Sequence, residues 1–111
     1  MAHIEVELTF LPTEHGGRKT PARTGYRPQF YYAGEDWDAE HEYVGAGELK
    51  PGETAKALVT FFSPQYHAGR VFVGMPFLIR EGNRVVGYGR VTQIMALGEF
   101  PGSEGGRSGA E

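Results

Sequence analysis

The spacing of apolar residues near the start of the chain constrains its fold more than any other feature. Apolar side chains occupy every second position from Ile4 to Phe10, and polar or charged side chains lie between them. This period of two is typical of a β-strand with one buried face, and no segment of the chain shows the period of a helix. Pro12 ends the strand. The pattern therefore predicts an all-β fold.

Further strands are expected where aromatic, β-branched and other apolar residues gather between turn signals. They are Gln29–Tyr32, Thr54–Phe62, Met75–Arg80 and Arg84–Met95. Glu81-Gly82-Asn83 predicts a tight turn between the last two strands. Gly87 and Gly89 predict a bulge or a close approach of two backbones in the final strand. The stretch Glu35–Gly47 mixes acids with glycines, so we expect an irregular or hairpin excursion there.

The length and composition allow one small globular domain. Of the 111 residues, 40% are hydrophobic and 13% aromatic, which suffices for a modest core. We expect the domain to span residues 1–96, followed by a disordered tail over residues 97–111 that is rich in glycine, serine and glutamate. No apolar run approaches the roughly eighteen residues of a membrane span, and no basic and apolar leader precedes the first strand. These features predict a soluble cytoplasmic protein with no membrane partner.

The most unusual segment is Gly16–Phe30, because it combines backbone-bending residues, cations and aromatics. Its glycines allow positive φ and its prolines fix φ, which predicts a shaped loop that leads into a strand. It carries four cations with no acid between them: Arg18, Lys19, Arg23 and Arg27. We expect Arg18 and Lys19 to hold a phosphate or carboxylate jointly, helped by the backbone N–H groups of Gly16 and Gly17. The alternative is a solvated basic loop without a ligand.

Charge is distributed unevenly along the chain. The formal net charge is −3, which argues against a general nucleic-acid binder. Five acids fall between Glu35 and Glu42 with no base among them, whereas the four cations of the loop lie between Arg18 and Arg27. We therefore expect an electrostatically two-sided molecule, whose basic side can still attract an anionic partner.

No arrangement of residues predicts catalysis or a metal site. The four histidines lack the i, i+4 spacing of a metal hydrolase and are scattered at His3, His15, His41 and His67. Acids flank His41, but neighbouring strand residues point to opposite faces. Ser63 lies near His67 in the chain but has no G-x-S-x-G elbow around it, and cysteine is absent. We expect a non-enzymatic protein with no cofactor and no bound metal.

Three segments in the same order carry a family resemblance. They read GGRKTP from Gly16, GYRPQFY from Gly25 and FLIREGNRVVGYGRVTQI from Phe77. The chain resembles the C-terminal, third domain of bacterial translation elongation factor Tu from His3 to Met95, although residues 35–52 fit poorly. This resemblance implies a small closed antiparallel β-barrel of about six strands. The chain contains no G-x-x-x-x-G-K-[ST] loop, so we expect no GTP binding by this chain alone.

The resemblance also implies a set of binding residues. In the family this domain packs on the GTPase domain and touches the T-stem backbone of aminoacyl-tRNA. The family positions that touch the RNA match Arg18, Lys19 and the turn Arg80-Glu81-Gly82. Lys19 replaces the usual histidine. Those near the GTPase domain match Tyr26, Arg27 and Gln29. Thr20 and Arg23 complete the expected site within the basic loop. Alternatively, these residues have structural roles and bind no partner. Tyr26 and Phe30 would then be core residues, and Arg27 would form an ion pair with a carboxylate of the barrel.

Two functions from different classes remain open. The first is a non-catalytic protein-interaction module, in which Tyr26, Gln29 and Tyr31 meet a separate protein or a second copy of the chain. The second is an RNA-backbone binder connected with translation, which uses Arg18, Lys19, Arg23 and Arg80. Two departures from the family weaken the RNA hypothesis: the acidic run from Glu35 to Glu42, and Ser63 where a lysine commonly precedes the proline.

Overall fold

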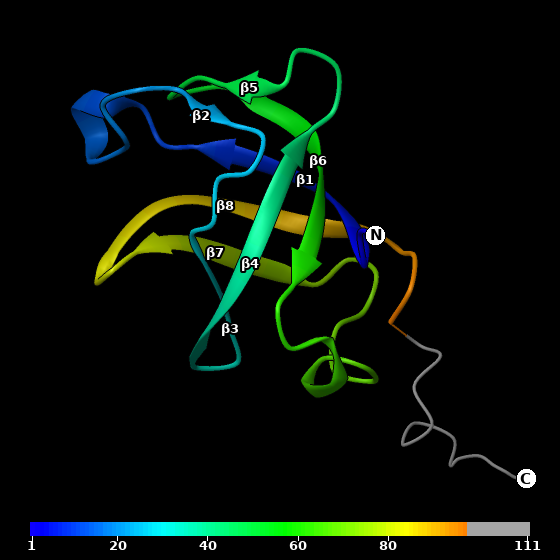
Figure 1. The fold of residues 1–111 in the computed structure, drawn as a ribbon. Coiled ribbons are helices and arrows are strands. Elements are labelled where there is room, and N and C mark those ends of the chain that lie inside the picture. The colour runs from blue at the N-terminus through cyan, green and yellow to red at the C-terminus, as the bar shows by residue number, and fades with distance from the viewer. Residues whose placement is uncertain (98–111) are drawn as a thin grey trace, which may run out of the picture.

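A closed β-barrel forms the body of the protein. The computed structural model describes residues 1–97. Six antiparallel strands pair in the order β1-β6-β4-β3-β7-β8, and β8 pairs back onto β1 (Figure 1). These strands are β1 (Ile4–Phe10), β3 (Gln29–Tyr32), β4 (Glu35–Tyr43), β6 (Thr54–Phe61), β7 (Pro76–Glu81) and β8 (Arg84–Ile94). The predicted all-β fold, a small antiparallel barrel of six strands, is confirmed.

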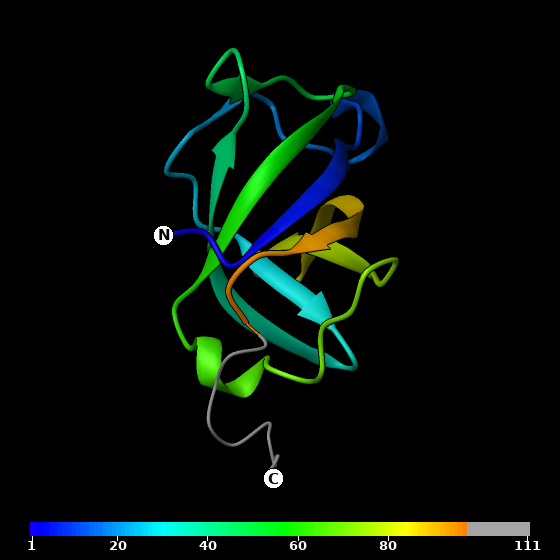
Figure 2. The same ribbon diagram turned by 90° about the vertical axis from the view of Figure 1, so that its right-hand side faces the viewer.

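Shorter elements lie at the two ends of the barrel. At one end, β2 (Ala22–Arg23) and β5 (Glu48–Leu49) form a two-stranded sheet, and at the other lies the 3-10 turn η2 (Pro64–Tyr66) (Figure 2). A second 3-10 turn, η1 (Thr13–His15), follows β1. Among residues 1–97 these turns are the only helical elements, and neither is long enough to cross a membrane.

The barrel interior is filled by alternate side chains of every strand. The four apolar residues that predicted β1 are all fully buried: Ile4, Val6, Leu8 and Phe10. At the centre, the ring of Phe30 stacks on Phe77 with centroids 4.2 Å apart and meets the edge of Phe61 at 5.0 Å. Because the inward positions are tightly packed, the outward positions of the same strands are held in fixed rows.

The acidic stretch after β3 is a regular barrel strand. Ala33 and Gly34 form a two-residue turn with positive φ, 51° and 83°, and β4 then pairs with both β3 and β6. The expectation of an irregular segment at Glu35–Gly47 is therefore wrong, although its hairpin alternative matches the β3–β4 connection. From Trp37 onward, alternate residues of β4 turn toward the interior, and the acids between them face outward. The inward set is Trp37, Ala39, His41 and Tyr43.

Gly87 and Gly89 bring β8 against its neighbours, as predicted. A Cβ atom on Gly87 would lie 2.6 Å from the carbonyl oxygen of Thr9. One on Gly89 would lie 2.6 Å from the carbonyl oxygen of Glu7 and 2.6 Å from the ring of Phe77. Side chains from the adjoining strands therefore occupy the space inside β8, and only glycine fits at these two positions.

The end of the barrel domain lies close to Leu97. This residue is 1% exposed and belongs to the same hydrophobic core as the strands. The remainder of the expected tail, residues 98–111, lies outside the described residues. The boundary at residue 96 stays a prediction.

Candidate functional site

The basic loop and the β7–β8 turn meet around the carboxylate of Glu81. The guanidinium of Arg18 forms an ion pair with Glu81 Oε2, and the hydroxyl of Tyr26 donates a hydrogen bond to the same oxygen. Arg84 Nη2 lies 3.3 Å from the other oxygen, Oε1. Arg18 also lies over the ring of Tyr26, with Cζ 4.4 Å from the centroid. We call these four residues the Glu81 cluster.

The Glu81 cluster satisfies its own charges. Burial alone would raise the pKa of Glu81, but hydrogen bonds from Tyr26 and Arg18, together with nearby positive charge, lower it below its usual value. Arg18 is only 18% exposed, and its Nε donates to the carbonyl oxygen of Thr20 at 3.2 Å. The anion that Arg18 holds in this structure is therefore the chain's own carboxylate.

The two glycines before Arg18 do not form the expected anion cradle. The N–H of Gly16 donates to Thr13 O at 3.2 Å, and the N–H of Gly17 donates to Pro12 O at 3.0 Å. A Cβ atom on Gly17 would collide with the backbone of Leu11, so this glycine serves a close approach of two backbone segments. The expectation that these two amides bind an external anion is wrong, because both are already satisfied inside the chain.

The other predicted cations of the loop point to separate surroundings. Lys19 is exposed. Arg23 is 82% exposed, and its Nε lies 3.9 Å from Glu48. Arg27 lies over the ring of Phe62, with Cζ 5.4 Å from the centroid. The loop therefore presents scattered cations, and Lys19, Arg23 and Arg27 are all exposed.

The remaining predicted residues lie on the adjoining strands. Arg80 has its Nε 3.6 Å from Asp36 and its Cζ 4.7 Å from the centroid of Tyr31. Gln29 donates from Nε2 to Asp38 at 3.3 Å. Gly82 takes φ of 61° in the two-residue β7–β8 turn. The structure thus brings Arg18, Thr20, Tyr26 and Glu81 together but separates them from Arg80 and Gln29.

A different surface combines the exposed Tyr88 with the half-buried Tyr31 and Leu78 on the outside of β1, β8, β7 and β3. The strand register places Tyr88 opposite both Thr9 and Leu78, and Leu78 opposite Tyr31. A second row, two residues further along, places Arg90 opposite both Glu7 and Pro76. We call these two rows the tyrosine face, which comprises Glu7, Thr9, Tyr31, Pro76, Leu78, Tyr88 and Arg90.

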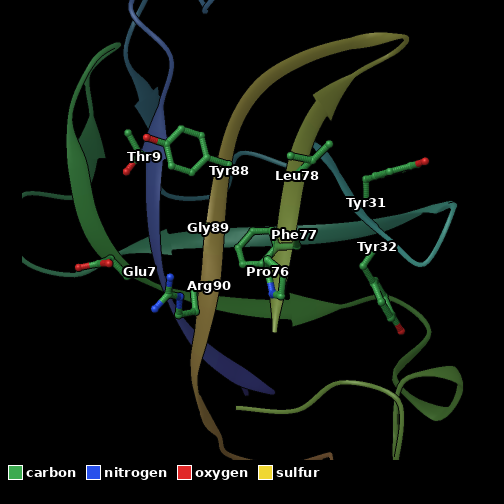
Figure 3. A pocket seen from close by; sticks show the side chains of 10 residues that line it. All are labelled: Glu7, Thr9, Tyr31, Tyr32, Pro76, Phe77, Leu78, Tyr88, Gly89 and Arg90. Atoms are coloured by element: carbon green, nitrogen blue, oxygen red, sulfur yellow. The ribbon is translucent and has the colours of Figure 1, made fainter. Parts of the chain in front are cut away.

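A hollow of about 470 Å³ lies on the tyrosine face. In Figure 3, Tyr88 and Leu78 stand side by side at one end of the hollow and Arg90 and Pro76 at the other, with Gly89 between them. A second hollow of about 440 Å³, which Arg70, Phe72 and Met75 help to line, shares Tyr32 and Pro76 with the first. Together they make a concave, largely apolar surface.

The tyrosine face has the chemistry of a contact surface. Tyr88 is 49% exposed, and each tyrosine offers an apolar ring with a hydroxyl group at its tip. The sequence indicated Tyr31 as a contact residue, but it did not indicate Tyr88, Leu78, Arg90 or Glu7. The alternation of side chains along a strand could have revealed Tyr88. It lies between two glycines that face inward, so its own side chain must face outward.

Two of the four histidines are structural. His67 and His41 are buried. His67 Nδ1 lies 2.6 Å from the hydroxyl oxygen of Tyr32. His41 Nδ1 lies 2.9 Å from the hydroxyl oxygen of Tyr43. Burial lowers the pKa of His41 to about 3 and that of His67 to about 4, so both are neutral near pH 7. Within residues 1–97, no three His, Asp or Glu side chains are grouped so that they could hold a metal ion.

Comparison with known protein families agrees with the barrel architecture. The family model described as elongation factor Tu C-terminal domain matches residues 1–95 of the 111-residue chain. The matched range includes all six barrel strands and therefore both the Glu81 cluster and the tyrosine face.

Proposed function

The chain belongs to the elongation factor Tu C-terminal domain family, and from that premise we propose that it is a non-catalytic module that binds a protein partner through the tyrosine face. The family is one of translation-factor domains, which is consistent with a role in or near translation. We further propose that the protein is cytoplasmic, that its domain spans residues 1–96, and that it uses no cofactor and binds no GTP by itself.

The hollow bordered by Tyr88, Leu78 and Tyr31 is the observation that carries this proposal. A concave apolar surface with tyrosines at its border suits the large side chain of a partner, and tyrosine is enriched among residues that dominate protein interfaces. The strands beneath are fixed by the core aromatics, so little ordering entropy is lost when a partner docks. Truncation of one central tyrosine typically weakens such a complex by about 2 kcal/mol or more.

RNA-backbone binding has less support from the geometry. A phosphate contact needs a cation that is not already neutralised. Arg18 is paired with Glu81 and Arg80 with Asp36, so two of the four cations assigned to RNA already hold carboxylates. Lys19 and Arg23 remain, and Arg23 is itself close to Glu48. We therefore rank RNA second, as the outcome that would overturn the proposal.

The test is affinity capture from a cell lysate with and without nuclease treatment. We expect a protein to stay bound after nuclease, and to be lost with Tyr88→Ala but not with Tyr66→Ala. Tyr66 is a matched control, because it is 54% exposed and lies outside the tyrosine face. Release of tRNA or rRNA by nuclease, with loss of binding in a Lys19→Ala, Arg23→Ala variant, would instead establish the RNA function.

A further inference from the structure

Two charged residues in the second row of the tyrosine face have no ion-pair partner among residues 1–97. Glu7 and Arg90 are exposed and lie directly opposite each other on β1 and β8. Within residues 1–97, Glu5 pairs with Lys56 and Glu81 pairs with Arg18, but no ion pair engages Glu7 or Arg90. An acid and a base are therefore available side by side on a surface that also exposes apolar groups.

We infer that the tyrosine face is an interface between two copies of this chain, an inference that rests on the proposed function and names the partner. A two-fold axis that runs between β1 and β8, parallel to the strands, lays β1 of each copy on β8 of the other, while β7 of each copy faces β6 of the other. Arg90 then meets the partner subunit's Glu7, and Glu7 meets the partner subunit's Arg90. The same operation sets Tyr88 against the partner subunit's Thr9. One type of contact thus forms twice, as a two-fold interface requires.

The charges on the face favour a second copy over a strongly charged partner. The tyrosine face contains one acid and one base, so it is neutral, while the whole chain carries a net charge of −3. A neutral face does not repel its own copy, whereas it gives no net attraction to a nucleic acid or a polybasic segment. The apolar groups of Leu78, Pro76 and Tyr88 beside this charge pair would lose water on association.

The closed barrel also restricts how two copies can associate. All six strands of the barrel are paired on both sides, so no barrel edge is free to add a strand from another molecule. Association through the barrel strands must therefore use an outward face. The hollow beside Gly89 makes the tyrosine face concave, so it can admit a side chain from the second copy.

Sedimentation equilibrium over a dilution series tests this inference with charge reversals. We expect the wild type to approach twice its 12.2 kDa mass at high concentration. Glu7→Arg or Arg90→Glu alone should weaken the dimer by about tenfold or more, because each places two like-charge pairs across the axis. A mixture of the two single variants should form a mixed dimer, because positions 7 and 90 then carry opposite charges at both contacts.

Controls separate this inference from loss of the fold and from the proposed function. Glu14→Arg reverses an exposed charge on η1 outside the face and should leave the dimer unchanged. Thermal melting should show that each variant folds. A monomeric wild type, or a dimer that the reversals and their mixture leave unaffected, would overturn the inference. If a monomeric wild type still captures another protein in a Tyr88-dependent way, the face remains a binding site and only the second copy is excluded. Capture that Tyr88→Ala does not change would overturn the face itself.

Discussion

Acidification from about pH 7 to about pH 5 should destabilise the fold through the two buried histidines. His41 and His67 have folded pKa values lowered to about 3 and about 4, against 6.5 for an unburied imidazole. The unfolded chain therefore binds more protons than the folded one below pH about 6.5, so stability is full above that pH and falls as the pH drops toward the folded values.

The size of this loss of unfolding free energy depends on how far the pH lies below 6.5. At pH about 5 both rings remain neutral in the fold, while each is almost fully protonated in the unfolded chain. Each histidine then lowers the free energy of unfolding by about 2 kcal/mol, at about 1.4 kcal/mol per pH unit, and the pair by about 4 kcal/mol. Glu81, whose folded pKa is below its usual value, is mostly ionised in both states over this range, so its contribution to stability is lost mainly at lower pH. A small domain has about 5–15 kcal/mol in all, so the loss should be large.

Urea unfolding followed by the fluorescence of Trp37 at the two pH values measures this loss. His67→Gln removes one titrating ring, and its amide oxygen can still accept a bond from Tyr32, so the pH-dependent loss should fall to about 2 kcal/mol. His15→Gln changes an exposed histidine and should leave the loss near 4 kcal/mol. An unfolding free energy that changes by less than about 1 kcal/mol between the two pH values would refute the neutral, buried state of both rings.

Three further predictions concern the barrel. Gly89→Val should lower the unfolding free energy by about 1–3 kcal/mol through overpacking against Phe77 and the backbone of Glu7, and an unchanged urea midpoint would contradict the close approach. Glu81→Gln should lower the unfolding free energy by about 1 kcal/mol at neutral pH, because the Glu81 side chain is 30% exposed and solvent screens such ion pairs. Urea unfolding should show a smaller loss at high salt than at low salt, and a stabilised variant would argue against the Glu81 cluster. Far-ultraviolet circular dichroism should show little helix, because the helical elements of residues 1–97 are two three-residue turns, and a helix-dominated spectrum would exclude the barrel.

The fold followed from local periodicity wherever that pattern was plain. The strand Ile4–Phe10 was predicted to the residue, because its apolar positions alternate without interruption. Glu35–Tyr43 was missed as a strand because the residues that fill its inward positions include a histidine and an alanine, and the acids on its outward positions dominate its composition. Periodicity was present there, but polarity obscured it.

The candidate site depended on contacts that no local pattern contains. Arg18 meets Glu81 across 63 positions of sequence, and only the closure of the barrel brings the basic loop against the β7–β8 turn. The sequence therefore named both residues without showing that they neutralise each other. The tyrosine face depends likewise on the register of four strands, which aligns Thr9, Tyr88, Leu78 and Tyr31 in one row.

Hydroxyl-radical footprinting tests the central claim most directly, because it reports the solvent contact of individual side chains. The reactivity of Tyr88 and Leu78 is compared between dilute protein and the associated or partner-bound state, with Tyr66 as an exposed residue outside the tyrosine face and both hollows. We expect Tyr88 and Leu78 to lose reactivity on association while Tyr66 keeps its reactivity. Unchanged reactivity at Tyr88, with protection confined to the basic loop, would contradict it.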